Sequence, residues 1–212
     1  ARARAAAPED VAGELVLGCV VRLDRGYPAI VCEGELFRAE FATRLTKGSF
    51  SRVAVGDWVC ARRPGTHEMG IIEEILPRKQ VLTRQDPAER TGRQVLAANI
   101  DLVFLLHALS GERINVRRLE REMVSAYDSG ATPVVVLTKA DLVGEDEAER
   151  VRGEVSDLAG QSVDVLVVSV GDDESIERVR ALMQPGEVAV LIGKSGVGKS
   201  SLVNVLAGSA VQ

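Results

Sequence analysis

The sequence predicts two domains, a small antiparallel β-barrel followed by an α/β domain with a parallel sheet. Between residues 15 and 77, short strand-like segments follow one another with no helical pattern between them. From residue 99 onward, strand-like and helix-like segments alternate, which is the order of a parallel sheet covered by helices. Near the end of the chain, the octapeptide GKSGVGKS (residues 193–200) lies between an apolar run and a helical pattern. This arrangement of strand, glycine-rich loop and helix is typical of a phosphate-binding loop.

The composition, 46% hydrophobic and 27% charged residues, is that of a globular protein with enough apolar residues for real cores. The longest apolar runs, about six residues, are too short to span a membrane, and no amino-terminal segment resembles a signal peptide. Cys19, Cys32 and Cys60 are odd in number and form no C-x-x-C pair, which argues against a zinc site or a disulfide framework. We therefore expect a cytoplasmic protein with no membrane partner.

Charge divides unevenly between the two halves of the chain. Residues 1–98 carry a net charge of +2 and residues 99–212 a net charge of −7. Any nucleic-acid contact is therefore expected early in the chain, although solvated surface explains so small a difference equally well. Residues 1–13 have no apolar period and are expected to form a flexible tail, with a basic RNA-binding arm as the alternative.

Residues 14–78 are expected to form the barrel, and an OB-fold that binds RNA is the natural candidate for five short strands in this space. The expected strands cover residues 15–23, 29–32, 35–41, 57–62 and 70–76. Trp58 is expected mainly as a core anchor of the barrel, with stacking on a nucleic-acid base as the alternative. Four basic residues lie in or beside the loop between the third and fourth strands, and RNA contact and simple solvation are equally plausible for them: Arg38, Arg44, Lys47 and Arg52. The polar segment 79–98 is expected to be an interdomain linker.

Residues 99–212 are expected to form the parallel α/β domain, with ligands at the carboxyl ends of the strands. The expected strands cover residues 102–106, 134–138, 163–169 and 188–192. The expected helices cover residues 116–128, 146–158, 175–183 and 199–207. His107 ends the first of these strands, and a structural role is favoured over a catalytic one.

The octapeptide matches the phosphate-loop pattern G-x-x-x-x-G-K-[ST] at every fixed position. Gly193 and Gly198 allow tight turns that aim main-chain N–H groups at phosphate oxygens, and the following helix adds the positive end of its dipole. Lys199 is expected to reach the β- and γ-phosphates, and the Ser200 hydroxyl to ligate Mg²⁺. These two are the candidate catalytic residues. The remaining loop residues are expected to contact the nucleotide: Lys194, Ser195, Gly196, Val197 and Ser201.

Upstream of this loop, Thr138, Lys139, Ala140 and Asp141 form a TKAD tetrapeptide at the end of an apolar run. It is similar to the guanine-reading motif NKxD with Thr in place of Asn, so the usual tie from this position to the phosphate loop is left open. A carboxylate at Asp141 can accept hydrogen bonds from guanine N1–H and the 2-amino group, a donor pair that adenine lacks. The stem of Lys139 would cover one face of the base.

Two further observations complete the expected nucleotide site. Ser169 and Val170 end the third strand of this domain, and the Val170 amide could donate to guanine O6. The base motif precedes the phosphate loop, whereas ordinary GTPases have the opposite order, so the sequence predicts a circularly permuted GTPase domain.

The segments LAANID (residues 96–101), VVVLTKADL (134–142) and IGKSGVGKSSLVN (192–204), after a barrel-like region, resemble the RsgA (YjeQ) family. Its members are circularly permuted GTPases of small ribosomal subunit assembly. The resemblance implies GTP and GDP binding with Mg²⁺, GTP hydrolysis stimulated by the small subunit, and ribosomal RNA contact through the barrel. It also implies a role in late subunit maturation. Lys194 stands where the family usually has Gln, and Thr138 where it commonly has Asn.

The resemblance further implies a switch segment, a DxxG motif and a zinc-binding domain beyond Gln212. We therefore expect the chain as given to be an incomplete GTPase domain that binds guanine nucleotide, hydrolyses it poorly and is monomeric. Two other interpretations stay open. One is an ATP-using phosphate-loop enzyme, and the other is an RNA-binding module whose guanine-nucleotide site is catalytically inert.

Overall fold

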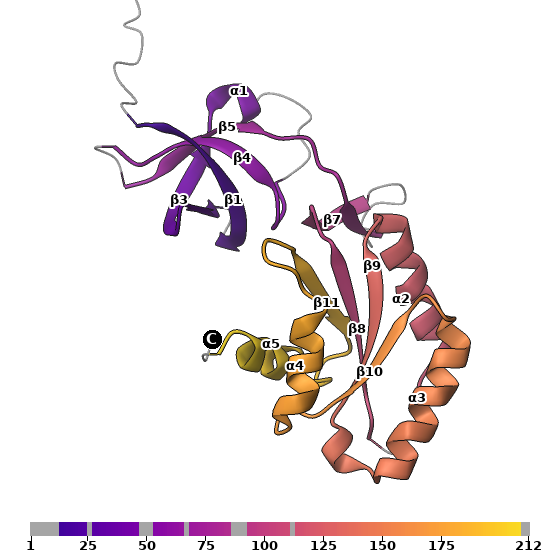
Figure 1. The fold of residues 1–212 in the computed structure, drawn as a ribbon. Coiled ribbons are helices and arrows are strands. Elements are labelled where there is room, and N and C mark those ends of the chain that lie inside the picture. Colours follow the sequence, from indigo (N-terminus) through magenta and orange to yellow (C-terminus); the bar gives the residue numbers. More distant parts are fainter. Residues whose placement is uncertain are drawn as a thin grey trace, which may run out of the picture. The chain divides into compact units, whose positions relative to one another are not determined.

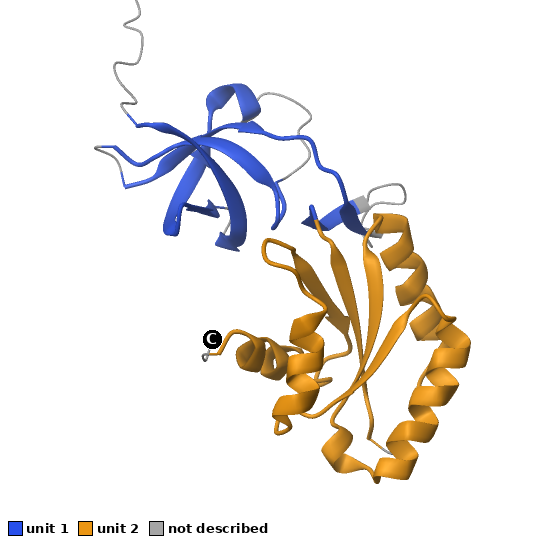
Figure 2. Cartoon of the chain, in the orientation of Figure 1, with its two compact units in different colours: residues 1–99 blue, residues 100–212 orange. Residues whose placement is uncertain are grey.

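The computed structural model describes residues 13–24, 27–46, 53–65, 68–85, 93–110 and 113–208. These residues divide into two compact units, which comprise residues 1–99 and 100–212 and are coloured separately in Figure 2. Most of the tail expected over residues 1–13 lies outside the described residues, as do Lys47 and Arg52. The α/β expectation begins one residue before the second unit.

The first unit contains the expected barrel. Its five strands are β1 (Leu15–Asp24), β2 (Tyr27–Cys32), β3 (Glu35–Phe41), β4 (Trp58–Arg62) and β5 (Gly70–Ile75). They close in the order β1-β2-β3-β5-β4 (Figure 1). The pairing of β3 with β5 is parallel and the other pairs are antiparallel. This is the five-stranded OB barrel that the sequence predicts. A short helix, α1 (Thr43–Thr46), follows β3.

Alternation along the strands fills the barrel interior with small and branched apolar side chains. Val20, Ile30, Val59 and Ile72 are each fully buried. Trp58 precedes Val59 and therefore points to the outer face, where 44% of its surface is exposed. The expectation that Trp58 anchors the core is wrong, because strand alternation places Val59 and Ala61 inside instead.

The outer face of the barrel carries an apolar row. Trp58 pairs with Cys19, Cys19 with Val31, and Val31 with Leu36, so these four residues lie side by side across β4, β1, β2 and β3. Directly opposite residues of antiparallel strands share a face of the sheet. Leu36 is 56% exposed. The row is therefore open to solvent within the described part of this unit.

The segment 79–98, expected to be an interdomain linker, holds two strands that the sequence did not predict. β6 (Val81–Gln85) and β7 (Arg93–Ala98) pair antiparallel, and Ala98 N–H donates to the Val55 carbonyl over 2.9 Å beside the barrel. Leu82 and Ala98 are almost fully buried, while most other residues of the segment are polar. Among the side chains of this ribbon that the structure describes, Leu82, Ala97 and Ala98 are buried. So few buried positions leave only a weak apolar pattern in the sequence, which is why the two strands were not predicted.

A buried polar cluster fixes this hairpin to the barrel. Asp57 is fully buried and accepts two hydrogen bonds of 2.7 Å from the Arg78 guanidinium, whose pKa the carboxylate raises. Asn99 donates from Nδ2 to the Gly56 carbonyl over 2.9 Å. Gly56 has a φ of 89°, and a Cβ there would lie 2.0 Å from the Ala98 carbonyl oxygen, so only glycine fits.

The second unit is a parallel α/β domain. Its strands are β8 (Leu102–Ala108), β9 (Thr132–Thr138), β10 (Asp164–Val168) and β11 (Ala189–Gly193). They lie in the order β10-β9-β8-β11, and every pairing is parallel. Its helices are α2 (Val116–Ser129), η1 (Ala140–Leu142), α3 (Glu145–Ala159), α4 (Asp173–Ala181) and α5 (Lys199–Leu206). Figure 1 shows α2 and α3 on one face of the sheet and α4 and α5 on the other.

Successive side chains of β8 point to opposite faces of this sheet, so the strand contributes residues to both. Phe104 and Leu106 pack with Leu202 of α5 and with the inward side of α4, in one continuous apolar core. His107 points to the opposite face, where its Nε2 lies 3.0 Å from Glu122 of α2. No helix in the described ranges is both long and apolar enough to cross a bilayer.

Candidate functional site

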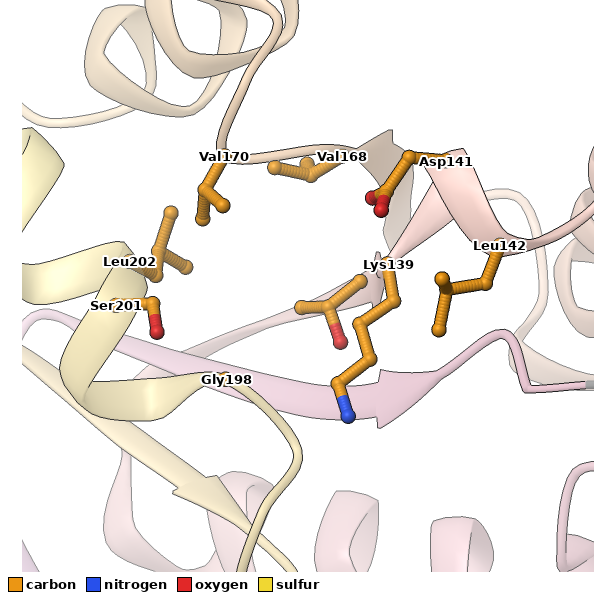
Figure 3. Close-up of a pocket in the computed structure, with 9 residues that line it drawn as sticks. Lys139, Asp141, Leu142, Val168, Val170, Gly198, Ser201 and Leu202 are labelled. Carbon is orange, nitrogen blue, oxygen red and sulfur yellow. The ribbon is translucent and has the colours of Figure 1, made fainter.

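A pocket of about 270 Å³ opens at the carboxyl ends of β9 and β10 and against the start of α5 (Figure 3). It brings together residues from the base motif and the phosphate loop, which lie far apart in the sequence. Its lining consists of Thr138, Lys139, Asp141, Leu142, Val168, Val170, Gly198, Ser201 and Leu202. In Figure 3 the Asp141 carboxylate points into the pocket, while Ser201 and Leu202 approach from α5. The edge of the sheet predicted to bind ligand therefore carries a cavity.

The side chain of Thr138 ties the base motif to the phosphate loop. Its hydroxyl is buried and lies 2.6 Å from the Val197 carbonyl oxygen and 3.4 Å from the His107 carbonyl oxygen. A hydroxyl has one proton to donate, and the shorter distance favours Val197 as the acceptor. The tie that the Thr-for-Asn replacement left open is therefore made by the threonine hydroxyl.

The phosphate loop adopts a conformation that needs glycine. Gly196 and Gly198 have φ values of 76° and 105°, in the left-handed region that other residues rarely adopt. A Cβ on Gly193 would lie 2.8 Å from the Leu106 carbonyl oxygen, so the end of β11 can approach β8 only without a side chain. Val197 is buried beneath the loop. The loop is thus a main-chain cradle, which suits anion binding by N–H groups.

Lys199 begins α5 and folds back over the loop. Its ammonium donates to the Gly193 and Lys194 carbonyl oxygens over 2.8 and 2.9 Å. These bonds hold the cation at the place where phosphate oxygens would contact the main chain. Ser200 and Ser201 follow in the first turn of α5, where main-chain N–H groups have no partner within the helix. The residues present therefore fit the phosphates of a nucleotide.

The residues present also fit Mg²⁺, but only in part. Ser200 offers a hydroxyl oxygen at the start of α5, and the phosphates of a bound nucleotide would supply further oxygen ligands. Among the described residues, no group of three or more His, Cys, Asp or Glu side chains could hold a metal ion. Cys19, Cys32 and Cys60 are all free thiols, and burial raises the pKa of Cys19.

The base side of the pocket is built on a tight turn. Lys139 has a φ of 60°, which turns the chain sharply from β9 into η1 and brings Asp141 to the pocket edge. The Ser169 hydroxyl donates to Asp141 Oδ1 over 2.9 Å. Ser169 thereby orients the carboxylate and leaves acceptor capacity for a ligand, because an ionised carboxylate has about four lone-pair sites. Val170 follows Ser169 and lines the pocket.

His107 does not line this pocket, and its contacts are those of a structural histidine. It is 8% exposed and lies beside Glu122, which also accepts from Arg118 Nε over 2.7 Å. Burial acts to raise the pKa of Glu122, but the hydrogen bonds from His107 and Arg118 outweigh it and lower that pKa.

The basic residues expected near RNA in the first unit have acidic partners where they are described. Arg38 lies 3.2 Å from Asp24, and Arg44 lies 3.1 Å from Glu73. Both guanidinium groups remain more than 60% exposed, so each keeps donors that face solvent.

Sequence reasoning missed three apolar residues of the pocket, Leu142, Val168 and Leu202. Leu142 directly follows the base motif and is 61% exposed, which marks it as available to a ligand. Leu202 could have been found from its position, because it lies one helical turn after Gly198 and faces the same side. The predicted site residues that do not line the pocket are Ala140, Ser169, Gly193, Lys194, Ser195, Gly196, Val197, Lys199 and Ser200. The lining is therefore more apolar than the motifs alone suggest.

Comparison with known proteins gives consistent matches. The family model described as "RsgA GTPase" matches residues 75–212. A protein of Streptomyces avermitilis named "Small ribosomal subunit biogenesis GTPase RsgA" is 37% identical over 205 residues, 97% of this chain and 54% of the relative. A protein of the same name from Xanthomonas campestris pv. campestris is 40% identical over 161 residues, 76% of this chain and 42% of the relative. The chain thus spans about half the length of the curated relatives it matches.

Two solved structures share the fold. The crystal structure of YjeQ from Thermotoga maritima aligns with a TM-score of 0.73 and 26% identity, over 91% of this chain and 65% of that one. The structure of YloQ, described as a circularly permuted GTPase, aligns with a TM-score of 0.68 and 22% identity, over 93% of this chain and 66% of that one. The second likeness concerns the fold alone.

Proposed function

This chain belongs to the RsgA GTPase family, and we propose that it carries the nucleotide-binding part of a GTPase that acts in maturation of the small ribosomal subunit. The names of the curated relatives support the ribosomal role. In this chain the base motif precedes the phosphate loop, and the fold it shares with YloQ, described as a circularly permuted GTPase, is consistent with that order. In this proposal the protein binds GTP, hydrolyses it and releases GDP.

One observation carries the proposal: Asp141 of the base motif and Gly198 of the phosphate loop line the same pocket. A carboxylate in that place accepts hydrogen bonds from guanine N1–H and its 2-amino group. Adenine has no such donor pair, so ATP would leave the carboxylate unpaired. The pocket therefore supports guanine over adenine and disfavours the alternative of an ATP-using enzyme.

The remaining residues divide the nucleotide between them. The Val170 amide would donate to guanine O6, and the Lys139 stem would cover one face of the base. Lys199 would exchange its two carbonyl acceptors for β- and γ-phosphate oxygens, and Ser200 would hold Mg²⁺. When bound, Mg²⁺ neutralises charge that develops on the phosphates during hydrolysis. The main-chain N–H groups between residues 193 and 201 would complete the phosphate cradle.

We further propose that the barrel contacts ribosomal RNA and that the protein works in the cytoplasm as a monomer. The OB topology supports nucleic-acid binding, since such barrels bind oligonucleotides on a strand face and adjoining loops. The exposed guanidinium groups of Arg38 and Arg44 offer donors to phosphates. The exposed position of Trp58 supports the stacking role that was the weaker alternative for that residue.

A calorimetric titration of this chain with GDP and with ADP tests the nucleotide part of the proposal. Binding of GDP at least about tenfold tighter than ADP is expected, from the charged hydrogen bonds at Asp141. Equal affinities would contradict it. The catalytic part is tested on the full-length protein, by GTP turnover with and without small ribosomal subunits. Turnover that stays at the uncatalysed rate in both cases would favour the alternative of an RNA-binding module with an inert nucleotide site.

A further inference from the structure

Helix α4 begins directly after residues 169–172, which we call the base-reading loop, and is joined to this loop by part-buried hydrogen bonds. The Ser175 side chain is 1% exposed, and its hydroxyl oxygen accepts from the Ser169 amide over 3.2 Å. The hydroxyl lies 2.9 Å from the Asp172 carbonyl oxygen and 3.1 Å from the Ser169 carbonyl oxygen, and the shorter distance favours Asp172 as the acceptor of its one proton. Asp172 caps the helix by accepting from the Ser175 amide. Because the Ser169 hydroxyl also donates to Asp141, the first turn of α4 and the base-reading carboxylate belong to one network.

The last turn of α4 contacts the end of α5 that lies away from the pocket. Arg180 Nη2 donates to the carbonyl oxygens of Val205 and Leu206, over 3.1 and 3.2 Å. These carbonyls lie at the carboxyl end of α5, the helix whose amino end forms part of the phosphate site. The Val205 carbonyl also accepts from the Gly208 amide over 3.2 Å, so Arg180 adds a second donor to it. A cation at this end of the helix also interacts favourably with the negative end of the dipole.

The far end of helix α5 is held by partly buried apolar contacts of Val205 and Leu206 with the core, and by the hydrogen bonds from Arg180. The helix has eight residues, and Leu202 is its one buried residue among those described. Leu202 lies in the first half of the helix, close to the phosphate loop. A helix of this length is about 12 Å long and behaves as a short rod, so a tilt at one end displaces the other. The hydrogen bonds from Arg180 to the carboxyl end of α5, called here the Arg180 cap, therefore affect the position of Lys199 and Ser200 at its amino end.

We propose that Arg180 is a positioning residue of the nucleotide site. From α4, which is anchored at the base-reading loop, it holds α5 so that the phosphate-binding end keeps its distance from Asp141. Arg180 does not line the pocket and acts through α5. The inference rests on the proposed guanine-nucleotide function and adds a residue to it that neither nucleotide motif contains.

The same helix offers a matched control. Arg178 is in the last turn of α4 as well, is exposed, and lies two residues before Arg180. Arg180 also pairs with Glu177, but an exposed pair three residues apart on a helix contributes little. Replacing either arginine with alanine removes one charge from the same helix turn. A difference between the two variants therefore reports on the contact with α5.

Calorimetric titration with GDP and with inosine diphosphate, which lacks the 2-amino group, tests the proposal on wild type, Arg180→Ala, Arg180→Lys and Arg178→Ala. Arg180→Ala should weaken GDP binding about threefold to tenfold, and Arg178→Ala less than about twofold. Lysine at position 180 should restore part of the affinity, because it can also donate to the carbonyls. The preference for GDP over inosine diphosphate should stay unchanged in all three. Equal GDP affinities for the two alanine variants, or a lost base preference, would overturn the proposal.

Amide hydrogen exchange of the nucleotide-free proteins separates positioning from general stability. Arg180→Ala should speed exchange in α5 more than in β8 and β9. Faster exchange throughout the α/β unit would show that Arg180 only stabilises the fold. Unchanged exchange in α5 would show that the hydrogen bonds from Arg180 do not stabilise this helix. Either result overturns the proposal. If wild type fails to bind GDP, the proposed function fails, while the exchange experiment still decides whether Arg180 holds α5.

Discussion

The Thr138 hydroxyl donates a hydrogen bond of 2.6 Å to the Val197 carbonyl, although 59 residues separate them in the chain. One bond thus joins the end of β9, where the base motif begins, to the middle of the phosphate loop. The Val197 carbonyl lies between Gly196 and Gly198, the two residues at which the loop bends. Without the Thr138 hydroxyl, this buried carbonyl would lose a hydrogen-bond donor. The two segments that we propose to bind the base and the phosphates are therefore joined by a hydrogen bond in the nucleotide-free structure.

Replacing Thr138 with Val should weaken nucleotide binding. Valine keeps the shape and removes the donor, so the Val197 carbonyl loses its partner at a cost of about 1–3 kcal/mol. Part of that cost should appear in the thermal unfolding midpoint and part in GDP affinity, both measurable by calorimetry. Thr138→Ser keeps the hydroxyl and serves as the control. If Thr138→Val and Thr138→Ser have the same unfolding midpoint and the same GDP affinity, the hydrogen bond from Thr138 to Val197 contributes nothing to stability or binding.

Replacing Asp141 with Asn should change base choice. The variant loses a charged acceptor, and GDP binding should weaken by at least about 1.5 kcal/mol. An amide donor at the same place suits the extra carbonyl of xanthine, so xanthosine diphosphate should bind better than it does to wild type. Competition between the two diphosphates measures the switch. Asp146→Asn, which removes an exposed carboxylate outside the pocket, should leave both affinities unchanged.

Replacing Lys199 with Ala should lower triphosphate affinity by well over tenfold while the fold survives, since the hydrogen bonds of its ammonium group to the described residues go to two loop carbonyls. Lys194→Ala is the matched variant in the same loop. It should have a much smaller effect, because position 194 contributes its main-chain groups. Fluorescent-nucleotide titration of both variants measures the difference, and equal losses would contradict the assigned roles.

Glu122 should make stability depend on pH in the acid range. Burial opposes its charge, but hydrogen bonds from His107 and Arg118 lower its pKa in the folded state below the ordinary value of 4.5. Its contribution is therefore present above pH 4.5 and is lost as pH falls through the lowered pKa. Glu122→Gln should destabilise the protein by about 1–3 kcal/mol near neutral pH. Chemical unfolding of wild type and Glu122→Gln across the acid range should show that the difference between their unfolding free energies becomes smaller as pH falls. A difference that stays constant with pH would contradict a contribution from the charge of Glu122.

Much of the fold could be predicted because its signals are local. Every barrel strand and every long strand and helix of the α/β unit begins and ends within two residues of its expected position. Glycine and polar turns mark these boundaries directly in the sequence. The hairpin of β6 and β7 could not be predicted, because it is stabilised by the barrel and buries few side chains of its own. Trp58 was misplaced because composition suggests burial while strand alternation decides the face.

The candidate site could be predicted only as far as its motifs extend. Asp141 and Lys199 follow from residue type and spacing. The bond from Thr138 to Val197 depends on how close β9 comes to the loop, which no local pattern reports. The cap from Arg180 depends on the relative placement of α4 and α5, so an arginine in a helix without a motif gives no sign of it. These longer-range contacts set the geometry that the motifs alone leave open.

Trp58 is the sole tryptophan of the sequence and lies half-exposed on the barrel. Its emission therefore reports on the barrel and gives no signal from the α/β unit. The far-ultraviolet circular dichroism signal comes mainly from the α/β unit, because the long helices α2 and α3 belong to it. Recording both during one urea titration separates the unfolding of the two units without labels or mutations. GDP should then raise the urea midpoint measured by circular dichroism. The urea midpoint measured by tryptophan emission should rise with it only if the two units unfold cooperatively.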